Sequence, residues 1–167
     1  GEPMMDLSVM RHLMREWGTT DRDVEYMMAA RRVQVTQLNE LFSPSCTQRL
    51  TGMPGSGALS DTTAQTAIND SEAAEECRKQ IAFLDSLIAR RIRLRRAVDW
   101  ALDDLSPAQR DTIRYRFEAT EAHPYGMEWA EVAEAMKQQD ERQVKRWEWN
   151  SLQKVSLFVL YYVGSGV

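Results

Sequence analysis

The sequence predicts an all-α protein, and three observations favour this fold class. Hydrophobic residues recur at steps of three and four through most of the chain. Alternating runs of Val, Ile and Thr, which are typical of strands, are almost absent. Gly and Pro gather in a few short segments. The chain has 167 residues, 43% hydrophobic and 28% charged, which is enough for one or two domains with buried cores.

Two helices are expected near the N-terminus, over residues 6–17 and 20–42. Gly18 follows the first helix at a position where a C-cap glycine is common. Thr20 precedes Asp23 by three residues, which approximates a capping box for the second helix. The second helix carries a heptad-like stripe interrupted by one arginine, and its members are Val24, Met28, Arg31, Val35, Leu38 and Phe42.

A flexible polar loop is expected over residues 43–63, because Ser, Gly and Pro are frequent there. It does not resemble a phosphate-binding loop, since no strand precedes the glycines and no Gly-Lys-Ser/Thr follows them. A long helix is then expected over residues 64–104, with a slip in its apolar pattern near Arg91. The two long helices predict a coiled-coil-like antiparallel hairpin within residues 1–104.

The expected helix over residues 64–104 would be about 60 Å long at about 1.5 Å per residue. That length exceeds a compact core of this size, so part of its apolar stripe must contact another helix or another subunit. We therefore expect a homo-oligomer, most simply a dimer, that forms through the long helices.

The C-terminal third is expected to contain shorter helices. Ser106 and Pro107 suit the N-cap and first position of a helix. A short helix is expected over residues 128–136, and after a four-residue polar turn a second helix begins at residue 141, with Asp140 as its N-cap. Residues 105–167 are accordingly predicted to form a second domain.

Two helices separated by a tight turn are typical of a helix-turn-helix, whose second helix enters the major groove of DNA. This recognition helix is expected over residues 141–155. It must bury one stripe, for which the sequence offers Val144, Trp147, Ser151, Leu152 and Val155. The residues expected to face DNA are Glu141, Arg142, Gln143, Lys145, Arg146, Trp149 and Asn150. Arg and Lys pair with guanine acceptors, and Gln and Asn pair with adenine.

Five segments of the C-terminal third carry a family resemblance: Leu105–Arg110, Ile113–Phe117, Glu128–Ala133, Asp140–Arg146 and Ser151–Val155. Together they resemble the region-four helix-turn-helix of bacterial sigma factors. The architecture of nearly the whole chain is similar to small phage and prophage transcriptional regulators of the ArpU and RinA type. The resemblance implies sequence-specific binding to double-stranded DNA, with RNA polymerase as a candidate second partner.

The resemblance also implies roles for residues inside the motif. The implied anchors of the two helices are Trp129, Val132, Ala133, Val144 and Leu152. Residues 118–127 depart from the family by forming a longer link than its usual Gly-containing connection. Asp140 and Gln143 stand where the family favours Ser or Thr and then Thr.

The charge distribution restricts where a nucleic acid could bind. The net charge is −4 and the isoelectric point is about 5.3, which argues against binding over the whole surface. The expected recognition helix is locally positive. A separate basic cluster comprises Arg90, Arg91, Arg93, Arg95 and Arg96. It is interpreted either as a second phosphate-binding surface or as a solvated helix face paired with acids such as Glu25 or Glu40.

Other functional classes find little support in the sequence. His12, His123, Cys46 and Cys77 lack metal-ligand spacing, and Cys77 is expected in the core. No nucleophile and base are recognisable as a set, so we expect neither an enzyme nor a cofactor. No apolar run approaches the roughly 18 residues of a membrane span, and the N-terminus has no apolar signal core, so a cytoplasmic location is expected.

A second hypothesis comes from a different functional class. The acidic net charge and the long striped helices also suit a helical assembly or adaptor protein, such as a small terminase-like packaging subunit. The apolar segment 157–163 would either complete the C-terminal core or pair with a second subunit. A stable oligomer without affinity for DNA would favour this alternative.

Overall fold

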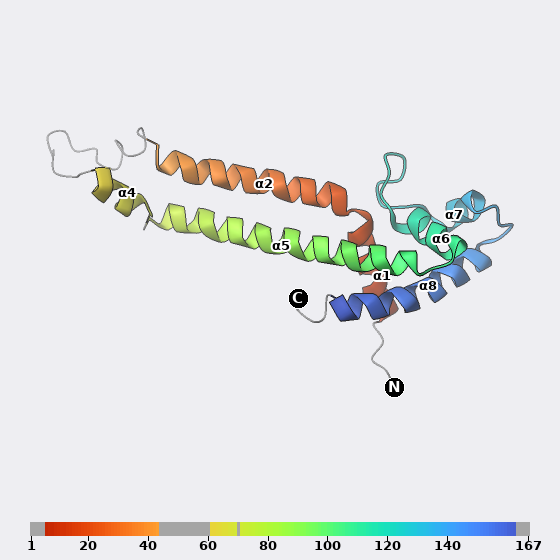
Figure 1. Ribbon diagram of the computed structural model, residues 1–167. Helices are drawn as coiled ribbons and strands as arrows, with labels where there is room; N and C mark the ends of the chain where they lie inside the picture. Colours follow the sequence, from red (N-terminus) through yellow and green to blue (C-terminus); the bar gives the residue numbers. More distant parts are fainter. Residues whose placement is uncertain (1–5, 44–60, 70, 163–167) are drawn as a thin grey trace. The chain divides into compact units, whose positions relative to one another are not determined.

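The computed structural model describes residues 6–43, 61–69 and 71–162, and seven helices form most of this part of the chain (Figure 1). They are α1 (Leu7–Gly18), α2 (Thr20–Leu41), α4 (Asp61–Asn69), α5 (Glu72–Asp103), α6 (Pro107–Phe117), α7 (Trp129–Ala135) and α8 (Glu141–Tyr162). The described ranges contain no strand, only an isolated bridge between Pro124 and Gly126. The predicted all-α class is therefore confirmed.

The chain divides into two compact units. The first unit joins the described residues up to Val24 with those from Ala89 onward, and the second contains the described part of residues 25–88. The sequence analysis predicts a domain boundary between residues 104 and 105. Whether the segments on its two sides fold independently stays a prediction. In the first unit, α1 packs against α6 and α8, so the N-terminal helix shares a core with the C-terminal third.

The main core of the first unit draws apolar side chains from four helices and one linker. Its buried members are Met10, Leu13, Met14, Trp17, Leu94, Val98, Ala101, Leu102, Leu105, Ile113, Phe117, Leu152, Val155 and Val159. At the edge of this core the Trp17 indole N–H donates a hydrogen bond of 3.0 Å to the Asp99 carboxylate. Burial of the stripe predicted for α1 explains why this short helix is stable, since isolated helices of this length are marginal in water.

In the second unit, the parts of α2 and α5 that belong to it run side by side in opposite directions (Figure 1). The arginine that interrupts the apolar stripe of α2, Arg31, donates a hydrogen bond of 2.6 Å to Asp85 of α5. Met28 belongs to the expected apolar stripe, and 44% of its surface is exposed. Cys77 is buried, as expected, whereas Cys46 and residues 44–60 of the predicted loop lie outside the described residues.

The prediction of one continuous helix over residues 64–104 is wrong. The structure contains α4, which ends at Asn69, and α5, which begins at Glu72. The hydroxyl of Ser71 accepts a hydrogen bond from the backbone N–H of Ala74, and this side chain competes with continued helical bonding. Ser71 therefore acts as a start signal for α5 that the apolar pattern alone did not reveal.

The junction of α1 and α2 also differs from expectation. Thr19, not Thr20, contacts Asp23, through a hydrogen bond of 2.6 Å from its hydroxyl. The Thr20 hydroxyl donates instead to the Glu16 carbonyl at 2.8 Å. The predicted capping box between Thr20 and Asp23 is therefore wrong, because Thr20 already lies inside the helix.

Gly18 is required by a close approach between backbones, not by the conformation of a C-cap. It is the last residue of α1, and Thr19 is the C-cap. A Cβ atom at Gly18 would lie 1.8 Å from the carbonyl oxygen of Phe117 at the end of α6. The Gly18 carbonyl accepts a hydrogen bond of 2.9 Å from the backbone N–H of Ala119, which holds the two segments together.

We predict that Gly18→Ala lowers the free energy of unfolding by about 1–3 kcal/mol, because α1 must move away from the α6 backbone. Helix propensity alone predicts the opposite sign, a gain of about 1 kcal/mol. Urea denaturation followed by circular dichroism measures the change. Ser86→Ala, at an exposed position of α5, is the control and should shift stability by less than about 0.5 kcal/mol. A stabilised Gly18→Ala variant would contradict the proposed backbone contact.

Candidate nucleic-acid interface

Helices α6, α7 and α8 pack against one another and carry the predicted DNA-binding residues. Ser106 accepts a hydrogen bond of 3.3 Å from the Gln109 backbone, and the Gln109 side chain accepts one of 3.3 Å from the Ser106 backbone. Pro107 is the first residue of α6. The predicted Ser-Pro helix start is thus confirmed, and it sets where the three-helix arrangement begins.

A small second core holds α7 against the N-terminal part of α8. Val132, Ala133 and Val144 form its buried centre. The partly buried side chains around it are Met127, Trp129, Met136 and Trp147. Four of the implied anchors therefore lie in this small core, and the fifth, Leu152, lies in the main core.

The turn between α7 and α8 is closed by backbone hydrogen bonds. The Lys137 N–H bonds to the Glu134 carbonyl at 3.1 Å, and the Gln138 N–H bonds to the Ala133 carbonyl at 2.8 Å. Lys137 adopts a positive φ of 57°. This pattern is a Schellman motif, in which glycine is the usual residue at the left-handed position. The turn is consequently short and well defined despite lacking glycine.

The predicted N-cap of α8 is confirmed. The Asp140 carboxylate accepts a hydrogen bond of 2.9 Å from the Arg142 backbone N–H and forms an ion pair of 3.2 Å with the Arg142 guanidinium. The backbone bond, together with the guanidinium, lowers the pKa of Asp140 below its ordinary value. Asp140 therefore carries a negative charge at neutral pH beside the residues expected to contact DNA.

The residues predicted to face DNA differ in how far their side chains are exposed on α8. At 3.6 residues per turn, Arg142, Arg146 and Trp149 lie opposite the buried stripe, and all three are exposed. The Arg142 side chain is 88% exposed. Lys145 and Asn150 are also exposed, whereas Glu141 and Gln143 are only partly exposed. The structure thus places Arg142, Lys145 and Arg146, the three cations of the prediction, on the exposed side of α8.

Two of these three cations already have an acidic neighbour. Lys145 lies 3.1 Å from Glu141, and Arg142 pairs with Asp140 as described. Arg146 has no ion-pair partner among the described residues. A phosphate would therefore meet an unpaired charge at Arg146 and would compete with a carboxylate at the other two positions.

A hollow of about 440 Å³ lies beside the turn at the start of α8. It is lined by Lys137, Gln138, Gln139, Asp140, Arg142, Gln143 and Arg146. Three of these side chains are cationic and one is anionic, so the hollow favours an anion. Lys137 was not among the predicted site residues, although its position in the turn just before the predicted N-cap could have identified it.

The buried Glu148 is the residue whose environment the sequence interpretation missed most clearly. Its side chain is fully buried, and it accepts hydrogen bonds of 3.0 Å and 3.2 Å from Nε and Nη2 of Arg11 on α1. The buried stripe expected for the recognition helix did not include Glu148. It lies four residues after Val144 and four before Leu152, and this helical spacing could have placed it on the buried side.

Trp129, at the start of α7, has two cations over its ring. The guanidinium carbon of Arg116 lies 4.7 Å from the ring centroid, and Nζ of Lys145 lies 5.8 Å from it. Arg116 also donates a hydrogen bond of 2.9 Å to the Met127 carbonyl. Burial lowers the pKa of Arg116, while the Glu148 carboxylate opposes this shift. Arg116 therefore links α6 to the start of α7 through these two contacts.

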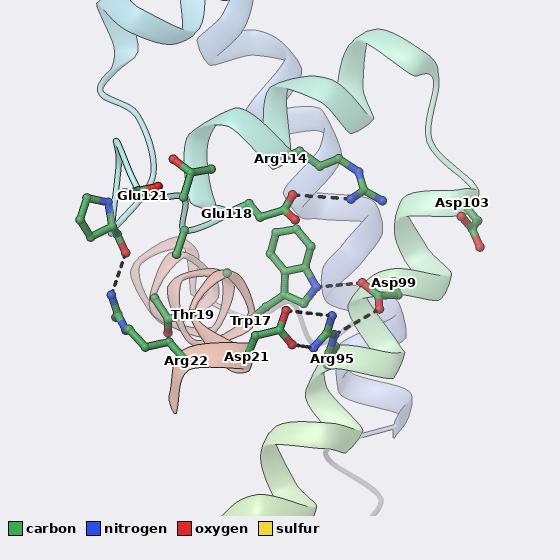
Figure 2. Close-up of a pocket in the computed structure, with 14 residues that line it drawn as sticks. Trp17, Thr19, Asp21, Arg22, Arg95, Asp99, Asp103, Arg114, Glu118 and Glu121 are labelled. Carbon is green, nitrogen blue, oxygen red and sulfur yellow. Dashed lines mark hydrogen bonds and ion pairs between the residues drawn. The ribbon is translucent and has the colours of Figure 1, made fainter. Parts of the chain in front are cut away.

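Two of the five arginines in the α5 cluster, Arg91 and Arg95, are engaged by acids of the same unit. Arg91 lies 2.7 Å from Asp23, and Figure 2 shows Arg95 between Asp21 and Asp99. These partners differ from the suggested Glu25 and Glu40, because the α1–α2 junction, and not the middle of α2, lies against these arginines. The interpretation as a paired helix face is thereby favoured at Arg91 and Arg95, whereas Arg90, Arg93 and Arg96 are exposed.

A second hollow, of about 640 Å³, lies beside Arg95 and is drawn in Figure 2. Acidic groups predominate around it. Five carboxylates and three guanidinium groups line it, and Arg114 pairs with Glu118 at 3.5 Å. An excess of carboxylates repels phosphate. This side of the first unit is therefore unsuited to nucleic acid.

The remaining titratable candidates have simple local partners. His12 lies 3.0 Å from Glu16, and His123 lies 2.6 Å from Glu131. The hydrogen bond with His123 lowers the pKa of Glu131. In the described part of the chain, no group of three or more His, Cys, Asp or Glu side chains is placed to hold a metal ion. None of the described helices has the length and apolar character needed to cross a bilayer.

We predict that Arg11→Met lowers the free energy of unfolding by roughly 3 kcal/mol, because Glu148 would be left buried without its partner. This value is at the low end for a buried pair, since the Arg11 side chain is 36% exposed. Arg11→Met with Glu148→Leu should recover part of the loss. Arg142→Met, which breaks an exposed pair, is the control and should cost less than about 1 kcal/mol. Equal losses for Arg11→Met and Arg142→Met in urea denaturation would contradict the prediction.

Comparison with protein-family models, curated proteins and solved structures found no match to this chain. The resemblance to ArpU- and RinA-type regulators therefore stays a prediction, based on the five segments of the C-terminal third.

Proposed function

We propose that this protein is a sequence-specific double-stranded DNA-binding transcriptional regulator, with the N-terminal part of α8 in the major groove. The observation that carries the proposal is the exposed cationic face of Arg142, Lys145 and Arg146 on a helix whose opposite side is buried. A B-DNA major groove admits an α-helix, and a rigidly held helix can present the same side chains to every site it meets.

The cationic groups have distinct expected roles. Lys137 lies in the turn and is suited to a phosphate, which would fix the position of the module on the duplex. Arg142 and Arg146 project from successive turns of α8 and are suited to guanine acceptors or to phosphates. Gln143, Trp149 and Asn150 flank this pair and are expected to contribute to specificity. Glu141 is held by Lys145 and is expected to limit that cation's reach.

The acidic character of the rest of the protein supports a single mode of binding. Carboxylates predominate in the hollow of Figure 2, so the field of the first unit disfavours DNA on that side. The resemblance to phage and prophage regulators supports the same function and adds RNA polymerase as a candidate partner. In this proposal the protein has no catalytic role and acts in the cytoplasm.

The alternative is a helical assembly or adaptor protein, such as a small terminase-like packaging subunit. Exposed apolar side chains on the second unit favour it, namely Tyr26, Val33 and Phe83 on α2 and α5. Such side chains are suited to contacts between subunits through the long helices. A stable oligomer that enriches no DNA sequence would favour this alternative.

We predict that Arg142→Ala with Arg146→Ala lowers affinity for a duplex enriched from random DNA, with Arg146→Ala alone costing about 1–3 kcal/mol. Fluorescence anisotropy at two salt concentrations measures affinity, and the salt slope should decrease because fewer counterions are released. Arg93→Ala with Arg96→Ala removes the same charge from exposed positions of α5 and should have little effect. Equal affinities for the α8 double variant and the wild type would exclude this recognition face.

We predict that Asp140→Asn strengthens DNA binding on the order of 3–10-fold at low salt, and less at high salt. Asparagine retains the N-cap acceptor but removes the carboxylate charge that competes with phosphate for Arg142. Asp104→Asn makes the same charge change at an exposed position before α6 and is the control. Weaker binding of Asp140→Asn would show that the carboxylate positions Arg142 for DNA and does not compete with it.

A further inference from the structure

One side of α5 is exposed and carries an ordered pattern of side chains. The opposite side of the helix buries Ala74, Cys77 and Ile88. Positions three and four residues apart share a face of a helix. The exposed positions connected by such steps are Glu72, Glu75, Lys79, Ala82, Ser86, Arg90 and Arg93. All of them lie on one unbroken helix, so helix geometry alone fixes their spacing.

The charges on this exposed face of α5 are separated by sign. Glu72 and Glu75 form an acidic pair near its N-terminal end, and Arg90 and Arg93 form a basic pair towards its C-terminal end. Glu75 lies 3.5 Å from Lys79, whereas the other three have no ion-pair partner among the described residues. Each pair is centred nine residues from the middle of this stretch, or about 14 Å along the helix. The face is therefore acidic at one end and basic at the other, at equal distances from its centre.

The centre of the face is apolar and has small neighbours. Phe83 is 58% exposed, and the adjacent Ala82 and Ser86 leave room for another helix. In the described part of residues 25–88, the buried apolar side chains are Ala64, Ile68, Ala74, Cys77 and Ile88. None of them comes from α2. A unit that buries so little apolar surface is stabilised when a partner covers it.

We propose that this face of α5 packs against α5 of a second copy of the chain, antiparallel about a two-fold axis beside residues 82–83. Glu72 then lies level with Arg93 of the partner subunit, and Glu75 lies level with Arg90 of the partner subunit. A two-fold interface repeats each contact, so an acidic pair meets a basic pair at both ends. The apolar centre of one copy covers that of the other.

Charge complementarity is the argument for a second copy and for the antiparallel direction. A helix with opposite charges at equal distances from one point is complementary to itself when it runs antiparallel. Parallel copies would place Glu72 and Glu75 level with the same carboxylates, which is unfavourable. Exposed ion pairs contribute little free energy, so the charges select the partner and the direction. Burial of the two Phe83 side chains beside the axis supplies affinity.

This interface lies on a different face of α5 from the contact that the sequence analysis expected. The analysis assigned the oligomer to the apolar stripe of the long helix, but Ala74, Cys77 and Ile88 of that stripe are buried within the chain. The interface also uses none of the residues proposed to contact DNA. It therefore stands independently of the proposed function.

Sedimentation velocity on the full chain in the micromolar range tests the inference. We expect a mass near twice the 19.2 kDa of one chain. Phe83→Glu should raise the dimer dissociation constant at least about tenfold, because two like charges would meet beside the axis. Tyr26→Glu is the control, since Tyr26 is an aromatic residue of α2 that is 79% exposed, and it should leave the dimer intact.

Charge reversal tests the direction of the helices. Glu72→Arg with Glu75→Arg, and separately Arg90→Glu with Arg93→Glu, should each raise the dissociation constant at least about tenfold, because like charges then face each other. A neutral substitution at Arg93 removes an attraction without adding a repulsion and should change it much less. Combining all four reversals keeps the net charge of −4 and should restore the dimer, because the swapped ends are again complementary in the antiparallel direction.

A matched control and a second measurement complete the design. Glu25→Arg with Glu40→Arg makes the first of these charge changes at exposed positions of α2 and should leave the dimer intact. Circular dichroism verifies that each variant is folded. If the fourfold variant does not fold, the two reversal variants are mixed in equal amounts, and a mixed dimer should form because the facing charges are then opposite.

The outcomes separate this inference from the proposed function. A monomeric wild type, or a dimer that persists in Phe83→Glu and in both reversal variants, would overturn the α5 interface. A folded fourfold variant that stays monomeric would overturn the antiparallel direction, and a mixture without a mixed dimer would overturn the charge complementarity. A dimer that responds to the variants as expected but enriches no DNA sequence would support the interface and overturn the proposed function.

Discussion

The continuous buried face of α8 is the constraint on which the rest of the first unit depends. Its N-terminal part contributes Val144 to the small core with α7, and its C-terminal part contributes Leu152, Val155 and Val159 to the main core. Because a helix is stiff over 22 residues, these two cores cannot shift independently along it. The position of the exposed cationic face is therefore set by the packing of the whole unit.

Electrostatics adds a second level of organisation to this helix. The buried Glu148 is bound by Arg11 of α1, so a charge on α8 is used to join the N-terminal helix to the C-terminal third. On the exposed side, Asp140 and Glu141 pair with two of the three cations. Such exposed pairs contribute little to stability, but they reduce the charge available to a phosphate. An interface of this kind would bind DNA weakly unless base contacts or a second subunit added to the affinity.

A homo-oligomer of the kind that the sequence analysis expected through the long helices would supply that additional affinity without new contacts to DNA, because a second half-site would bind at a high effective concentration. The exposed apolar side chains of the second unit, among them Tyr26 on α2, are suited to contact another protein. RNA polymerase is the candidate that the family resemblance implies.

The sequence by itself determined the helical class and the start signals that depend on local chemistry. Helical periodicity, the Ser106-Pro107 start and the Asp140 N-cap are local properties, and the structure confirms each of them. Local patterns failed where side chains compete with the backbone, as at Ser71, which divides the helix expected over residues 64–104.

Only the tertiary structure decided which charges are buried and which glycines lie against another backbone, because both depend on segments distant in sequence. Gly18 is required by the close approach of the Phe117 carbonyl. The carboxylate of Glu148 is buried against Arg11, which is 137 residues away in sequence but donates a hydrogen bond of 3.0 Å to it. The partners of the α5 arginines at the α1–α2 junction were hidden for the same reason. Periodicity identifies the side of a helix that faces inward, but the approach of another segment determines what that side contacts.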